Sequence, residues 1–205
     1  MGLYAKYVLP NLIHIACGSS SFSQQREKIV PLAEGNVLEI GVGTGLNLPF
    51  YDGNKVNKLK AIEPSLDTWE KCEVDLESLP FEFEFILASA EKLPFEDNSF
   101  DSIVMTYTLC TIPNPHKALQ EMKRVLKPNG SLLFSEHGIA PTKRVRFVQK
   151  AINPIWKQFS GGCNLSRNIP ELIKESGFIL SESNEMHIPG WKPGSYNYWG
   201  RATKK

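Results

Sequence analysis

A glycine cluster directly after an apolar run is the feature of this sequence that most restricts its fold. Residues 37–45 read VLEIGVGTG. The apolar residues of this segment are typical of a buried strand, and its glycines are typical of a tight turn. Glycine is expected there because a side chain would hold the backbone away from a bound nucleoside. Glu63 follows twenty positions after Gly43, at the end of a second apolar run. A carboxylate at that place is suited to accept both hydroxyls of a ribose.

The spacing of the glycines distinguishes between classes of nucleoside. A dinucleotide-binding turn reads G-x-G-x-x-G and places a pyrophosphate on a helix N-terminus. In this chain the third glycine is Gly45, and Leu46 stands where the longer pattern requires glycine. No Walker lysine follows the turn. The pattern therefore predicts a nucleoside site without a phosphate cradle, and its alternative is an ordinary glycine-rich turn between a strand and a helix.

Apolar and amphipathic segments alternate along the chain, which is typical of a parallel sheet covered by helices on both faces. Strands are expected at Val37–Ile40, Leu59–Ile62, Phe81–Phe85 (an edge strand), Ser102–Met105 (a central strand) and Leu132–Ser135, followed by an antiparallel hairpin of Phe178–Ile188 and Ser195–Thr203. Helices are expected near Leu48, from a Ser65 cap towards Leu79, from Asn114 to a turn at Pro128–Gly130, over Lys143–Asn153, and from Pro170 to Gly177. The sequence predicts a single α/β domain over residues 1–205, with a Rossmann-like, seven-stranded, mostly parallel sheet.

The composition excludes several classes of protein. The chain carries 23 Lys and Arg against 22 Asp and Glu, so no basic field attracts nucleic acid. The four cysteines are far apart and form no C-x-x-C pair, so we expect no metal and a reducing compartment. No apolar run approaches the roughly 20 residues that span a bilayer, and no cleavable signal peptide is evident. These observations predict a cytoplasmic location.

Three segments resemble the class I S-adenosylmethionine-dependent methyltransferases. The E-x-G-x-G-x-G segment that begins at Glu39 resembles their motif I. Residues 89–101 (SAEKLPFEDNSFD) and 119–130 (LQEMKRVLKPNG) are similar to segments of the small-molecule, type 11 branch. Ser89 departs from the branch, which has Asp there, so its hydrogen bond to the cofactor would be neutral and weaker.

The resemblance also implies a cofactor site and a class of acceptor. Shorter segments look like methyltransferase-like proteins that include thiol S-methyltransferases: NLPFY at 47–51, TLC at 108–110, SEH at 135–137 and GCNLSR at 162–167. The family implies S-adenosylmethionine as cofactor, S-adenosylhomocysteine as product and a small-molecule acceptor. The cofactor-binding residues that it implies are Glu39, Gly41, Val42, Gly43, Thr44, Gly45, Asn47, Glu63, Pro64, Ser89, Ala90, Glu91, Thr106 and Tyr107.

The candidates on the acceptor side each have two interpretations. His137 is placed to act as a general base with a pKa near neutrality, or to orient a loop. Tyr107 either covers the methionine part of the cofactor or packs in the core. Cys110 either lines the pocket or is a small buried apolar residue. Arg167, in the segment from Cys163, either meets an anionic group of the acceptor or caps a helix and makes a surface ion pair.

The N-terminal segment, residues 1–35, is predicted to be a helical lid in front of the catalytic core at 36–205. Residues 3–15 are rich in apolar side chains, are interrupted by Pro10 and carry a single charge, Lys6. Such a segment is able to fold over the cofactor and acceptor, or to lie weakly on a membrane surface. The scarcity of Lys and Arg favours the lid.

Three classes of function remain. The first is methyl transfer to a small molecule, with thiols preferred over amines and hydroxyls. The second is methylation of a phospholipid amine at a membrane surface, and the third is a nucleoside-binding module without catalysis. An RNA methyltransferase is disfavoured because TYTL occupies residues 106–109, where base N-methyltransferases carry an Asn/Asp-Pro-Pro-Tyr/Phe tetrad.

Overall fold

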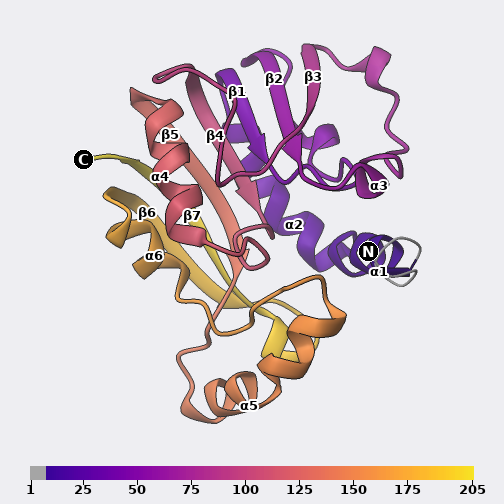
Figure 1. The fold of residues 1–205 in the computed structure, drawn as a ribbon, viewed down its shortest axis with the longest axis vertical. Coiled ribbons are helices and arrows are strands. Elements are labelled where there is room, and N and C mark those ends of the chain that lie inside the picture. The colour runs from indigo at the N-terminus through magenta and orange to yellow at the C-terminus, as the bar shows by residue number, and fades with distance from the viewer. Residues whose placement is uncertain (1–7) are drawn as a thin grey trace.

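A computed structural model describes residues 8–205 and arranges this part of the chain around one seven-stranded sheet (Figure 1). The strand order is β3-β2-β1-β4-β5-β7-β6. Strands β1 to β5 are parallel to one another, and β7 is antiparallel to both of its neighbours. The strands are β1 (Gly35–Ile40), β2 (Val56–Glu63), β3 (Glu82–Leu87), β4 (Phe100–Thr106), β5 (Leu126–His137), β6 (Phe178–His187) and β7 (Tyr196–Lys204). This arrangement confirms the predicted sheet, with β3 near one edge and β4 in the centre.

Helices pack on both faces of the sheet, as predicted. They are α1 (Leu9–Cys17), α2 (Ser20–Ile29), α3 (Leu66–Trp69), α4 (Pro115–Val125), α5 (Lys143–Phe159) and α6 (Ile169–Glu175), with short 3-10 turns η2 (Val30–Leu32), η3 (Leu48–Phe50), η4 (Leu76–Ser78) and η5 (Lys192–Gly194). Within residues 8–205, no helix combines the length and the apolar character that crossing a membrane requires.

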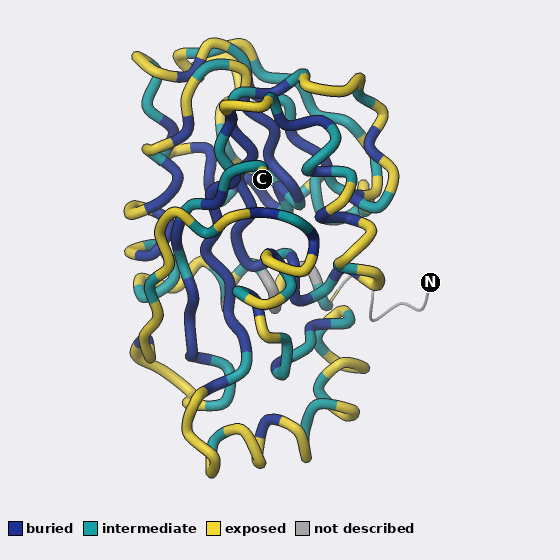
Figure 2. The backbone as a smooth tube through the Cα atoms, turned by 90° about the vertical axis from the view of Figure 1, so that its left-hand side faces the viewer, coloured by how far each residue is buried: buried dark blue, intermediate teal, exposed yellow. Residues whose placement is uncertain are grey.

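The alternation of side chains along the strands produces two apolar layers. Leu38 belongs to one buried cluster and its neighbour Val37 to the other, because successive residues of a strand point to opposite faces. The first layer includes Leu119 of α4, and the second includes Ile29 of α2. Both faces are therefore shielded from water, and Figure 2 shows the interior strands as mostly buried.

The predicted helix from Ser65 towards Leu79 is wrong in length, because the observed helix is much shorter. Ser65 does cap it, since its hydroxyl accepts a hydrogen bond from the Thr68 amide at 3.3 Å, but α3 ends at Trp69. The Trp69 ring stacks on Phe85 with 4.5 Å between centroids, which fixes the chain against β3. Asp75 then accepts a hydrogen bond from the Glu77 amide and starts the separate turn η4.

Two further boundaries differ from the predictions. The expected turn at Pro128–Gly130 is instead part of β5, where the pairing with β4 is irregular. A Cβ atom on Gly130 would lie 2.8 Å from the Asp101 carbonyl oxygen, so this glycine allows the close approach of the strands. Helix α5 continues through Pro154 to Phe159, and Trp156 on its last turns packs against Trp191 at 5.0 Å between centroids.

Truncating Phe134 tests this account of the core. Phe134 is fully buried in β5, so Phe134→Ala should reduce the free energy of unfolding by about 3–5 kcal/mol. The matched change Leu87→Ala, at a side chain that is 57% exposed, should change it by less than about 0.5 kcal/mol. Denaturant titrations of both variants give the comparison. Equal losses at the two positions would contradict the assignment of the core.

Candidate active site

A pocket of about 440 Å³ opens beyond the carboxyl ends of β1, β2 and β4. The strand order reverses between β1 and β4, and open α/β sheets bind ligands at such a switch point. The residues predicted for the cofactor that line this pocket are Glu39, Gly41, Val42, Gly43, Thr44, Asn47, Glu63, Pro64, Ser89, Ala90, Thr106 and Tyr107. Three predicted site residues, Gly45, Glu91 and His137, are not part of the lining.

The glycine loop has two structural roles. Gly43 has a φ of 57°, and a Cβ atom placed on it would meet nothing nearer than the Gly41 carbonyl oxygen at 4.0 Å. The loop therefore leaves space for a ligand beside its backbone. Gly45 has a φ of 81°, and a Cβ there would lie 2.6 Å from the Cys72 sulfur. Gly45 consequently lets the loop pack on its own chain.

Glu63 at the end of β2 faces this loop. One oxygen of its carboxylate accepts a hydrogen bond from the Gly43 amide at 3.3 Å and the other from the Ser65 amide at 3.1 Å. Burial raises the pKa of Glu63, and the two backbone hydrogen bonds lower it in part. A positioned carboxylate beside an open glycine backbone fits the ribose of S-adenosylmethionine.

A buried hydrogen-bond network lies beneath the loop. The Glu39 carboxylate accepts hydrogen bonds from the Asn47 amide nitrogen and the Tyr51 hydroxyl, each at 2.9 Å. Burial raises the pKa of Glu39 to about 7, against the opposing effect of these two hydrogen bonds. The Asn47 oxygen in turn accepts from Arg26 Nε at 3.0 Å and from the Thr106 hydroxyl at 3.1 Å. Both carboxylate oxygens of Glu39 are thus occupied, and its role is to hold the loop.

The N-terminal helices α1 and α2 form one wall of the pocket, and the residues of this wall were not predicted from the sequence. Leu9, Cys17 and Arg26 line the pocket, and His14 Nδ1 lies 2.7 Å from the Thr44 hydroxyl. Arg26 Nη1 also donates to the Cys17 carbonyl at 2.6 Å. No motif in α2 marks Arg26, so sequence reasoning missed it. Residues 1–7 of the predicted lid (1–35) lie outside the described residues, and the movement of the lid stays a prediction.

Tyr107 has a strained backbone at the base of the pocket. Its φ is 54°, an uncommon value for a residue other than glycine, and such strain is often found at functional positions. Its ring packs edge-on against Phe22 at 4.6 Å between centroids, and its oxygen accepts a hydrogen bond from the Ser135 hydroxyl. Burial raises the pKa of Tyr107 well above its usual value. Tyr107 therefore shapes the pocket as a neutral ring.

The loop after β4 forms the opposite wall through Thr108, Thr111 and Ile112. Glu136 fixes this loop, because one of its buried carboxylate oxygens accepts hydrogen bonds from the Thr108 amide at 2.7 Å and the Leu109 amide at 2.9 Å. Burial raises the pKa of Glu136 to about 7, and these amide donors lower it in part.

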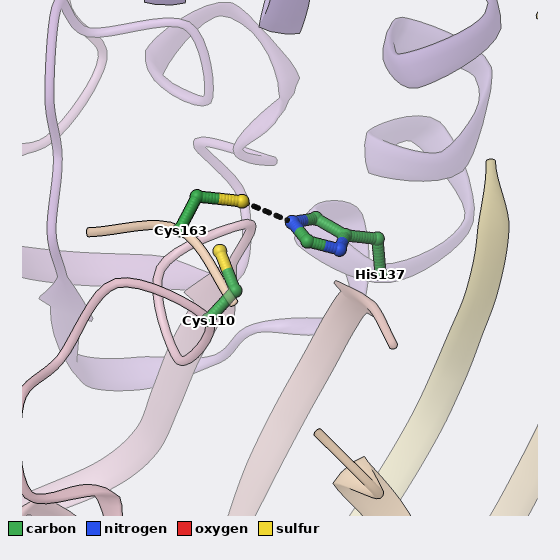
Figure 3. A group of neighbouring side chains, drawn as sticks. All are labelled: Cys110, His137 and Cys163. Atoms are coloured by element: carbon green, nitrogen blue, oxygen red, sulfur yellow. Dashed lines mark hydrogen bonds between the residues drawn. The ribbon is translucent and has the colours of Figure 1, made fainter. Parts of the chain in front are cut away.

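The predicted acceptor-side residues lie behind this wall. The Arg167 guanidinium donates to the carbonyl oxygens of Leu109 and Ile112 and so supports the loop, whereas its contact with an anionic group of the acceptor stays a prediction. His137 Nε2 lies 3.1 Å from the Cys163 sulfur, beside the buried Cys110 (Figure 3). Its action as a general base stays a prediction.

Ser89 and Glu91 belong to the loop after β3. Ser89 lines the pocket, and its oxygen accepts a hydrogen bond from the Glu91 amide at 3.3 Å. The Glu91 carboxylate accepts from the Asn114 amide at 2.7 Å, which ties the loop to the start of α4. The loop is thus held in position at the pocket, with Glu91 as its anchor.

Comparisons with known proteins agree with this geometry. The family described as "Methyltransferase domain" matches residues 38–134. The chain is 34% identical to thiol S-methyltransferase TMT1B of Rattus norvegicus, over 89% of this chain and 76% of that protein. It is 30% identical to thiol S-methyltransferase TMT1A of Homo sapiens, with the same two coverages. Its fold is similar to that of a SAM-dependent methyltransferase from Thermotoga maritima, with a TM-score of 0.62, 24% identity and coverage of 99% and 96%.

Removing the Glu63 carboxylate tests the cofactor site. Glu63→Ala should raise the dissociation constant of S-adenosylhomocysteine at least about tenfold, because a hydrogen bond to a charged group contributes roughly 1.5–3 kcal/mol. Isothermal titration calorimetry measures this constant, with the exposed Glu77→Ala as the matched control. Wild-type affinity in Glu63→Ala would refute the placement of the cofactor.

Proposed function

The chain belongs to the methyltransferase domain family, and from this premise we propose that it transfers the methyl group of S-adenosylmethionine to a small thiol. The observation that carries the choice of acceptor is the 34% identity to a thiol S-methyltransferase over 89% of this chain.

Methyl transfer requires the protein mainly to position the acceptor and to exclude water. When bound, S-adenosylmethionine would supply a sulfonium whose methyl carbon is open to in-line attack by the acceptor sulfur, with S-adenosylhomocysteine as the leaving group. The chain has to hold the acceptor sulfur against the methyl group and exclude water. Apolar side chains suited to this task line the pocket at Leu9, Val42 and Ile112.

The lining of the pocket also supports a thiol. A thiol ionises in solution, so the enzyme needs no strong base, whereas an amine or hydroxyl acceptor must lose its proton to a nearby group. The Tyr107 oxygen is hydrogen-bonded, and burial raises the pKa of the Cys17 thiol to about 11, although Arg26 opposes the shift. His137 is outside the lining. Tyr107 and Cys17 are therefore protonated at neutral pH, and both carboxylates of the lining, Glu39 and Glu63, already accept hydrogen bonds within the protein.

We also propose that the protein works in the cytoplasm on a small-molecule partner. Cys17, Cys72, Cys110 and Cys163 are all free, as a reducing compartment favours. The expected absence of nucleic acid rests on the balanced charge of the chain. Methylation of a phospholipid amine is the competing function.

The pH dependence of turnover separates these acceptors. Free thiols have a pKa of about 8.5, so the rate with a thiol should rise roughly tenfold per pH unit below that value. Thiols of lower pKa should reach their maximal rate at lower pH. His137→Ala should retain this slope, because the ionisation belongs to the acceptor. Initial rates for a series of thiols, in wild type and variant, provide the measurement.

Two outcomes would refute a thiolate acceptor. One is a rate that ignores the pKa of the thiol, bends near the pKa of a histidine and falls by about 10²-fold in His137→Ala. The other is turnover confined to vesicles that contain phosphatidylethanolamine, which would assign the protein to lipid methylation.

A further inference from the structure

Three side chains that are distant in sequence meet behind the pocket wall. Cys110 follows β4, His137 ends β5 and Cys163 follows α5. The three are buried, with 2%, 8% and 9% of their surfaces exposed, and their ligand atoms all lie within 4.8 Å of one another. Figure 3 shows both sulfur atoms turned towards the same edge of the imidazole ring. Two sulfurs and one nitrogen that converge in this way form a possible metal-binding set.

The distances within the cluster suit a tetrahedral ion. Bond lengths to zinc place neighbouring sulfur and nitrogen ligands about 3.6–3.8 Å apart around a tetrahedron. The Cys163 sulfur and His137 Nε2 are 3.1 Å apart, so small rotations of the side chains accommodate an ion between them. Two cysteines and one histidine leave one coordination position for water or another small ligand, as in catalytic zinc sites.

The surroundings of the cluster support it as a metal site. The Trp156 indole nitrogen donates a hydrogen bond to the Cys163 sulfur at 3.3 Å, and such contacts orient thiolate ligands. The Asn164 amide donates to the Cys110 carbonyl at 3.0 Å, which joins the two loops that carry the cysteines.

The charges near the cluster are balanced for a divalent ion. Two thiolates would neutralise the charge of such an ion, so the occupied site would carry no net charge in its buried place.

We propose that Cys110, His137 and Cys163 bind a zinc ion. Zinc is the expected metal because it prefers thiolate and imidazole ligands in a tetrahedral arrangement, whereas calcium and magnesium require oxygen. The site is independent of which acceptor is methylated.

Metal binding to the full-length chain tests the proposal. Zinc and cobalt should each bind at about one ion per chain, and the cobalt form should show the visible absorption of a tetrahedral thiolate complex. Cys110→Ser and Cys163→Ser should each weaken zinc binding at least about tenfold in competition with a chromophoric chelator. Cys72→Ser removes a cysteine outside the cluster and should bind as wild type does.

A measurement on the unaltered protein covers the case in which a variant fails to fold. The visible absorption of the cobalt form of wild type should reach its maximum at about one cobalt per chain, and one equivalent of zinc should abolish it. Absence of zinc binding, equal affinity in all three cysteine variants, or cobalt binding without this absorption would each overturn the proposal.

A separate observation concerns the exposed face of α5. This helix lies at the lower end of the molecule in Figure 1, and Figure 2 shows that region as mostly exposed. Phe147 is 74% exposed and Ile155 is 65% exposed, two helical turns apart on one side of the helix.

The charge of α5 indicates what covers this surface. The helix contains five Lys and Arg residues and no Asp or Glu: Lys143, Arg144, Arg146, Lys150 and Lys157. A helix that combines exposed aromatic and aliphatic side chains with basic ones is typical of segments that lie in the interface of an anionic membrane. We propose that the α5 surface, comprising Phe147, Ile155 and these basic residues, docks on an anionic lipid surface.

Vesicle sedimentation of the full-length chain tests this surface. Wild type should sediment with vesicles of phosphatidylcholine and phosphatidylserine, much less with phosphatidylcholine alone, and less as salt increases. The double variant Phe147→Glu, Ile155→Glu should lower the bound fraction at least about fivefold. Leu87→Glu, Ile179→Glu adds the same charge at exposed apolar positions of β3 and β6, and should bind as wild type does.

Three results would each overturn the docking surface. The first is that wild type does not sediment with the vesicles, and the second is that the α5 variant sediments as its matched control does. The third is that wild type associates with itself without vesicles and the α5 variant does not, which would assign the surface to a second copy of the chain.

Discussion

Hydrogen bonding to the Asn47 side chain is the interaction on which the rest of the site depends. Asn47 joins Glu39 of β1, Arg26 of α2 and Thr106 of β4. A buried carboxylate and a buried guanidinium are costly unless both are paired, so the network fixes three elements together. Burial raises the pKa of Glu39 from 4.5 to about 7. The contribution of Glu39 to the free energy of unfolding is therefore complete below pH 4.5 and is lost as the pH rises through about 7.

The network has a functional consequence because it lies directly beneath the glycine loop. The loop must present bare backbone at Gly43 while Glu63 faces it from the next strand. On the other side of the pocket, Glu136 performs a similar task for the loop after β4. Two buried carboxylates therefore shape the two walls, and the chemistry of methyl transfer requires mainly this positioning.

Local patterns predicted much of this structure, and contacts between distant segments were not predictable. The glycine spacing and the caps at Ser65 and Asn114 depend on neighbouring residues, so the sequence contains their signal. The predicted length of α3 was wrong because the helix ends where Trp69 stacks on β3, and this tertiary contact leaves no local signal in the sequence. Arg26 has no motif, and it enters the site only because α2 packs against the pocket. The meeting of Cys110, His137 and Cys163 likewise depends on the sheet topology.

The identity of the acceptor is the central claim, and a screen of acceptors tests it most directly. Separate pools of small thiols, amines, phenols and quinols, and phosphatidylethanolamine vesicles, are incubated with the full-length chain and S-adenosylmethionine. The measured quantity is the S-adenosylhomocysteine formed. The account predicts product in the thiol pool well above the background of the other pools. Product confined to any other pool, with the thiols at background, would contradict it.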